Sequence, residues 1–294
     1  MARTLSLLLL GVLAEAALAA PAAVTIDTAG RLYLAAGLRQ QVAASLAGMP
    51  AKLKEMFVAE SQGKLDAQRL AAVTKAAKLT FRIDVFEPSA LAAFAANLDP
   101  QAAQESLAFL ASPAGERMVS ADVALAKLDP AVIDQIASGK IAAPTTPQRT
   151  ALFKQIESAG RATDSAAEVY MTIGRSLAVG KAMGYGLSLE DAQVAVGKKA
   201  PPTPAPELLQ SLEVPLGRYV AYDYRGLSDA DLRAMLAFLD SPAGKTYVNA
   251  SIDALVAGFR SMSRRCGERI GESWREIAQS EAQDEAAVAP SAPH

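Results

Sequence analysis

The 294-residue chain is longer than a usual single domain, so we expect two modules. Its residues are 51% hydrophobic but only 5% aromatic, and alanine is abundant, which favours helices packed through small side chains over strands. The 29 basic and 31 acidic residues give a formal net charge of −2 with no block of one sign, so composition gives no argument for binding nucleic acid or an anionic membrane.

Residues 1–19 have the pattern of a signal peptide. Arg3 gives a short positive region, residues 5–13 are apolar, and residues 17–19 form an A-x-A cleavage site. The apolar stretch is too short to cross a bilayer, and no other uncharged run approaches the roughly 20 apolar residues that a membrane helix needs. We therefore expect an exported mature protein without an integral membrane segment, periplasmic if the source is a Gram-negative bacterium and secreted otherwise.

The first predicted module spans residues 20–138. Helices are predicted over residues 31–46 and 51–62, and further helices complete the module from about residue 65 onward. Residues 139–147 are the predicted linker to the second module.

The second predicted module spans residues 148–262 and contains a glycine-rich helical segment, residues 161–185. Glycines at positions 174, 180, 184 and 186 resemble a phosphate-binding loop, but the spacing is wrong and Ala182 stands where a serine or threonine must bind the metal. We therefore interpret these glycines as positions of close helix packing or of a bent helix.

Residues 263–281 are predicted to form a terminal amphipathic helix. Arginines cluster around Cys266, whereas Trp274 lies on the apolar face and is expected to anchor the helix in the core. Residues 282–294 are rich in alanine, proline and acidic residues, and we expect them to form a disordered tail.

One segment of the chain occurs twice, with an offset of 129 residues. Residues 107–115, LAFLASPAG, recur as residues 236–244, LAFLDSPAG, and the copies agree at 10 of the 15 positions from Leu107 to Ala121. We interpret the repeat as an internal duplication. The expected fold is therefore all-α, with two helical-bundle modules related by that duplication and preceded by the signal peptide.

Each copy of the segment predicts a helix, a tight bend and a second helix. Leucines at helical spacing precede a serine, whose hydroxyl is a typical N-cap, and the following proline suits the first position of the next helix. The glycine lacks a side chain, which would let another helix approach the bend closely. We therefore expect the repeated residues to be structural: Phe109, Ser112, Pro113 and Gly115 in the first copy, and Phe238, Ser241, Pro242 and Gly244 in the second.

This F-x-x-S-P-x-G segment resembles the domain-of-unknown-function 2059 family of exported bacterial proteins, and the resemblance covers only the two repeated regions. The chain has Leu110 and Leu239 where a second aromatic residue is common in the family. Glu116 replaces the usual amide or basic residue, so the second copy, with Lys245, is the closer match. The resemblance implies a compact helical domain and export, and it implies no activity and no catalytic residues.

The histidine and cysteine content restricts the chemistry of the chain. The single histidine is His294, in the expected tail, so neither a histidine-dependent catalytic centre nor a histidine-ligated metal site is expected. Cys266 is also single, so no internal disulfide can form; the thiol is either free and buried or pairs between chains. We expect no catalytic residues, no cofactor and no metal.

These observations favour a non-catalytic exported protein that binds another envelope protein or assembles with itself. An alternative is a carrier or sensor of a small apolar ligand, held in a gap lined by Met183 and Tyr185 of the glycine-rich segment. A weaker alternative is a carboxylate-dependent hydrolase, which would require two buried acids facing one cleft.

Overall fold

The computed structural model describes residues 24–198 and 203–288, and within these ranges every regular element is a helix. The all-α class expected from the sequence is confirmed. The expected signal peptide, residues 1–19, lies outside the described residues. Among the described helices, none has the length and apolar character needed to span a bilayer.

The helices follow one another through short bends, many of them capped at the start of the next helix by a serine, threonine or aspartate side chain. The loop between α8 and α9 coincides with the predicted linker. In chain order the elements are α1 (Ile26–Ala35), α2 (Leu38–Ala47), α3 (Met49–Glu60), α4 (Ala67–Thr80), α5 (Ile83–Asn97), α6 (Pro100–Leu110), α7 (Pro113–Ala126), α8 (Pro130–Ser138), α9 (Pro147–Ala159), α10 (Ala162–Gly184), α11 (Leu189–Gly197), α12 (Pro206–Asp223), the 3-10 helix η1 (Tyr224–Gly226), α13 (Asp229–Asp240) and α14 (Pro242–Val288).

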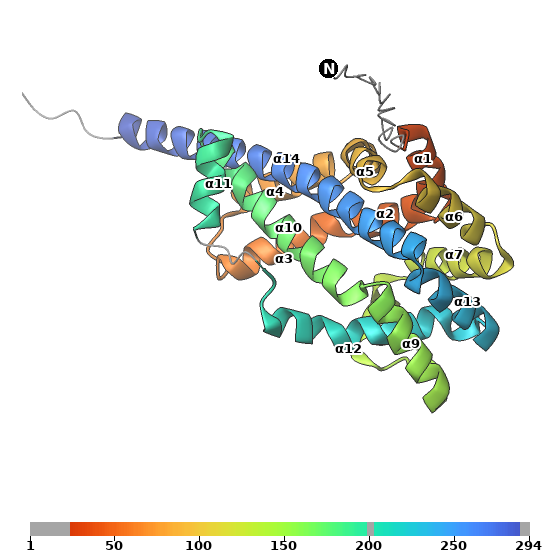
Figure 1. Ribbon diagram of the computed structural model, residues 1–294. Helices are drawn as coiled ribbons and strands as arrows, with labels where there is room; N and C mark the ends of the chain where they lie inside the picture. The colour runs from red at the N-terminus through yellow and green to blue at the C-terminus, as the bar shows by residue number, and fades with distance from the viewer. Residues whose placement is uncertain (1–23, 199–202, 289–294) are drawn as a thin grey trace, which may run out of the picture.

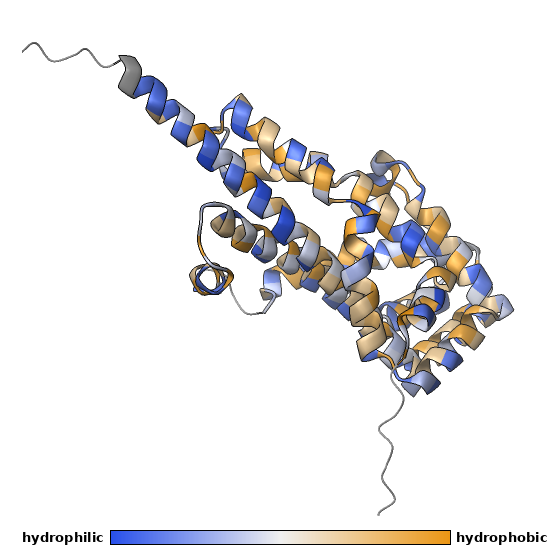
Figure 2. Ribbon diagram, turned by 90° about the horizontal axis from the view of Figure 1, so that it is seen from above, coloured by the Kyte–Doolittle hydropathy of each residue, from blue (hydrophilic) through white to orange (hydrophobic). Residues whose placement is uncertain are grey.

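Helix α14 runs the length of the molecule (Figure 1). It passes residue 262, where we expected a module to end, and residue 282, where we expected a disordered tail to begin, without a break. Residues 278–285 are exposed, and the projecting end of the helix is mostly hydrophilic (Figure 2). This end is rich in alanine, glutamate and glutamine, whose high helix propensity explains why the helix continues where little packs against it.

The close crossing of α10 and α14 is the most extensive helix–helix contact of the fold. A Cβ atom added at Gly180 would lie 1.9 Å from the backbone oxygen of Arg264, and one added at Gly184 would lie 2.2 Å from that of Glu268. Gly267 makes the equivalent close approach from α14, because a Cβ there would lie 2.1 Å from the backbone oxygen of Leu177. The two backbones therefore touch, as in helix pairs with small residues four positions apart. Close packing, one of the two interpretations of the glycine-rich segment, is confirmed.

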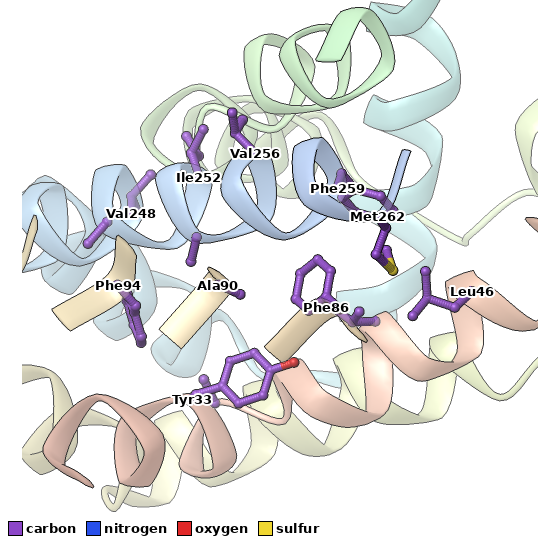
Figure 3. Close-up of a cluster of buried hydrophobic side chains, with 14 of the residues drawn as sticks. Tyr33, Leu46, Phe86, Ala90, Phe94, Val248, Ile252, Val256, Phe259 and Met262 are labelled. Atoms are coloured by element: carbon purple, nitrogen blue, oxygen red, sulfur yellow. The ribbon is translucent and has the colours of Figure 1, made fainter. Parts of the chain in front are cut away.

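The hydrophobic core lies along α14 and takes in helices of both predicted modules. Figure 3 shows the ring of Phe86 of α5 between α5 and α14. Three edge-to-face ring pairs join earlier helices to α14: Phe94–Tyr247 with centroids 6.2 Å apart, Phe86–Phe259 at 5.4 Å and Phe57–Trp274 at 5.7 Å. Trp274 is only 9% exposed and donates a hydrogen bond of 3.1 Å to the backbone oxygen of Arg69, which confirms its expected place in the core.

Cys266 is a free and fully buried thiol on α14. Burial raises its pKa to about 11, so little of the reactive thiolate is present at neutral pH. We expect native protein to react with a thiol reagent such as Ellman's reagent at least about 100-fold more slowly than protein unfolded in guanidinium chloride. Fast labelling of the native protein, or a dimer that is lost on reduction, would contradict this prediction.

Candidate functional site

The two Ser-Pro bends have the same local structure. Ser112 accepts a hydrogen bond from the backbone N–H of Gly115 at 3.2 Å, and Ser241 accepts one from that of Gly244 at 3.0 Å. Each serine thus caps the helix that its proline begins, α7 in one case and α14 in the other.

The repeated glycines allow each new helix to rest on the end of the preceding one. A Cβ atom at Gly115 would lie 2.1 Å from the backbone oxygen of Phe109, and one at Gly244 would lie 1.9 Å from that of Phe238. No other residue fits these positions without moving the backbone. The local geometry therefore accounts for the Ser-Pro-x-Gly pattern by capping and close approach.

The side chains of the two bends also meet each other. The rings of Phe109 and Phe238 are stacked, with centroids 4.1 Å apart and an interplanar angle of 6°. We name α6–α7 the first hairpin, and α13 with the start of α14 the second hairpin. The phenylalanines occupy equivalent positions of the repeat, so the hairpins face each other through the same residue.

Removing either serine cap tests the structural interpretation of the bends. We expect Ser112→Ala and Ser241→Ala each to lower the free energy of unfolding by about 1 kcal/mol, because an unpaired helix N–H is left at the bend. The exposed Ser280 of α14 is the matched control, and its replacement by alanine should change stability by less than about 0.5 kcal/mol. Urea unfolding followed by circular dichroism measures all three; two cap variants as stable as the control would contradict this account.

A hollow lies beside each bend, and we name them the first and second hollows by their hairpins. The second hollow is an open depression of about 930 Å³ between α9, α13 and α14, and the first is an open depression of about 490 Å³ between α7, the end of α6 and the end of α1. Three positions line both hollows at the repeat offset: Glu116, Val119 and Ser120 in the first correspond to Lys245, Val248 and Asn249 in the second. The same face of the second helix of each hairpin is therefore left partly uncovered.

The second hollow has an apolar base and a cationic edge. Ala159, Leu236 and Val248 contribute apolar surface, whereas Lys154, Arg161 and Lys245 contribute positive charge. Asp240 is the one carboxylate of the lining. The first hollow differs in charge, because it has one acid, Glu116, and one base, Lys127.

Asp122 of α7 and Asp223 of α12 form a half-buried acid pair. The hydroxyl of Tyr224 donates a hydrogen bond to Oδ1 of Asp122 at 2.8 Å. Burial, together with repulsion by Asp122, raises the pKa of Asp223 to about 8, and burial raises the pKa of Asp122 to about 6. Close to neutral pH the pair therefore keeps one proton. Neither acid lines the first or the second hollow, so the pair does not meet the cleft requirement of a carboxylate-dependent hydrolase.

A bidentate ion pair also joins the two hairpins. The guanidinium of Arg117 on α7 donates to the carboxylate of Asp231 on α13 at 2.6 and 3.1 Å. The bond from Arg117, with a second from Ser228, lowers the pKa of Asp231 to about 2. The relative placement of the hairpins is thus fixed by an ion pair as well as by the ring stack.

The positions of the bends could be predicted from the sequence, but most of the residues that line the second hollow could not. All eight repeated residues lie at or next to the bends, and none of them lines either hollow. Lys154 and Arg161 come from a helix and a bend that the repeat does not include, so no pattern in the sequence points to them. Lys245 could have been found, because its contrast with Glu116 is visible when the copies are aligned.

The chain was compared with known proteins, and no protein-family model, curated protein or solved structure matches it. Within residues 24–198 and 203–288, no group of three or more histidine, cysteine, aspartate or glutamate side chains could hold a metal ion. The candidate site is therefore described by its geometry alone: a shallow hollow with apolar and cationic side chains in its lining.

Proposed function

We propose that the protein is a non-catalytic, exported helical protein that binds another protein of the cell envelope, or another copy of itself, through the second hollow. The observation that carries the proposal is the recurrence of a partly uncovered helix face beside both bends. Apolar and charged side chains side by side in an open hollow can bury one side chain of a partner and pair with its charge.

We also propose that the two hairpins arose by internal duplication and that they belong with the domain-of-unknown-function 2059 proteins. The duplication is supported by three features: a serine caps the second helix of each hairpin, the glycine of each bend makes the same close contact, and the equivalent phenylalanines are stacked. The family assignment rests on the F-x-x-S-P-x-G residues. Export rests on the pattern of residues 1–19 and leads to the periplasm in a Gram-negative source.

Neither alternative function gains a specific observation. At Gly180 and Gly184, α10 leaves no gap for an apolar ligand, because the backbone of α14 fills that space. Tyr185, one of the two residues expected to line such a gap, is 47% exposed. The acid pair opens onto neither hollow. We therefore propose neither a carrier of apolar ligands nor a hydrolase.

Affinity purification from an envelope extract of the source organism tests the proposed function. The tagged mature chain should recover a stoichiometric partner, or elute as a homo-oligomer in size-exclusion chromatography with light scattering. The variant Lys245→Glu should lose this association, and Glu116→Lys, the reciprocal change at the equivalent position, should retain it. A monomer without a partner, or association that is equal in all three chains, would show that the second hollow is not the binding surface.

A further inference from the structure

We propose that the second hollow binds an acidic, partly apolar segment of the partner, whose carboxylates are held by Lys154, Arg161 and Lys245. This inference rests on the proposed function and specifies the chemistry of the partner. Three cations and the single carboxylate of Asp240 line the hollow, on a chain with a formal net charge of −2. An acidic segment is therefore attracted to the hollow and disfavoured by the charge of the chain as a whole.

The cations of the hollow are available to a ligand. Among the residues that the structure describes, neither Lys154 nor Lys245 forms a salt bridge, and Arg161 has only a long one, 3.7 Å to Asp164. All three cationic residues are exposed. Their charge is therefore not neutralised inside the chain, as it is for Arg117, whose bidentate pair with Asp231 occupies its guanidinium.

Arg161 is held in place before any ligand binds. Its backbone is left-handed, with φ 53° and ψ 37°, a conformation that costs a residue other than glycine about 1 kcal/mol or more. From this position its guanidinium donates a hydrogen bond of 2.7 Å to Oδ1 of Asn249, which also lines the hollow. The bend and α14 thus fix the guanidinium at the edge of the hollow, which reduces the entropy that it loses on binding a carboxylate.

The apolar base favours a peptide segment over a small anion. Ala159, Leu236 and Val248 offer surface that an apolar side chain can bury, whereas a small anion gains nothing from it. The volume of about 930 Å³ is within the range of ligand sites in proteins. Acidic residues that flank an apolar one match both parts of the hollow.

The first hollow supplies a comparison within the same molecule. It shares the valine of the base but has Glu116 where the second hollow has Lys245, and its volume is about 490 Å³. An acidic segment should therefore choose the second hollow. Exchanging the charge at these two positions changes the preference without touching the bends.

The experiment is a titration of the mature chain into a fluorescein-labelled peptide of alternating glutamate and leucine, followed by fluorescence anisotropy. We expect saturable binding that weakens with added salt and at least about tenfold in Lys154→Glu/Lys245→Glu. Lys52→Glu, the same charge reversal at an exposed lysine of α3 that lines neither hollow, is the matched control and should bind as the wild type does. Circular dichroism checks that each variant is folded, which their exposed positions favour. Inorganic phosphate and phosphatidylglycerol vesicles are the competing probes.

Each result decides the proposal. The absence of peptide binding, binding unchanged by the double charge reversal, or competition by phosphate or vesicles as strong as by unlabelled peptide would overturn it. If a captured partner stays bound in the presence of excess peptide and also binds the Lys245→Glu variant, the acidic-segment inference is wrong while partner binding stands. If the peptide binds as expected but the envelope extract yields neither partner nor oligomer, the proposed function is wrong and the chemistry of the hollow stands.

Discussion

Replacing Gly180 by valine should lower the free energy of unfolding by about 3 kcal/mol or more. A single Cβ atom at this position would already lie 1.9 Å from the backbone oxygen of Arg264, so α10 and α14 would have to separate. Overpacking a core commonly costs about 1–3 kcal/mol, and the cost rises when the obstacle is backbone and not a side chain that can turn away. Urea unfolding followed by circular dichroism measures the change.

Gly174 provides the control on the same helix. It is exposed, and a Cβ atom built there meets nothing within 4 Å. Gly174→Ala should therefore raise the free energy of unfolding by about 0.5–1 kcal/mol, because alanine loses less conformational entropy in a helix. If valine proves too disruptive for purification, Gly180→Ala reports the same contact. A Gly180→Ala chain as stable as Gly174→Ala would contradict the close crossing.

The stability of the protein should fall as the pH rises from 5 to 8. The folded chain raises the pKa of Asp223 to about 8 and that of Asp122 to about 6, well above the values of the two carboxyls in the unfolded chain. At a pH between the unfolded and the folded pKa values, the folded state therefore binds more protons than the unfolded state. The stabilisation is complete below the unfolded pKa and is lost as the pH passes the folded values. At about 1.4 kcal/mol per pH unit for each proton released, we expect a loss on the order of a few kcal/mol. Thermal or urea unfolding at a series of pH values measures it.

Asp223→Asn removes the repulsion in the pair and should flatten this pH dependence. The neighbouring groups are Tyr224, which donates to Asp122, and Arg225, which lowers the pKa of Asp223 only in part. Asp253→Asn, at an exposed aspartate of α14, should leave the slope unchanged. A wild-type chain with constant stability between pH 5 and 8, or equal slopes in both variants, would contradict the shared proton.

The bends illustrate what the sequence could predict. Capping and first-turn chemistry are local, so Ser112 and Ser241 could be placed at the starts of helices from their neighbours alone. The same is true of the exclusion of a phosphate loop at Gly180, because spacing decides it. Both are properties of a few consecutive residues.

The remaining features depend on residues that are far apart in the chain. Nothing in the sequence around Gly267 indicates that α10 crosses it. Likewise, the sequence around Asp122 does not indicate that it pairs with Asp223, which lies on another helix. The charge of the second hollow likewise combines Lys154 with Lys245. Periodicity carries no information on such pairings, since it records which face of a helix is apolar and not which helix covers it.

The position of α14 has a consequence for the order of events during synthesis. Phe57, Phe86 and Phe94 each have a ring partner on this last helix, so their packing is complete only after its residues have left the ribosome. We therefore expect the core to be completed late in synthesis. For the export that we propose, a core that only the last helix completes would favour passage of the chain through a narrow translocation pore.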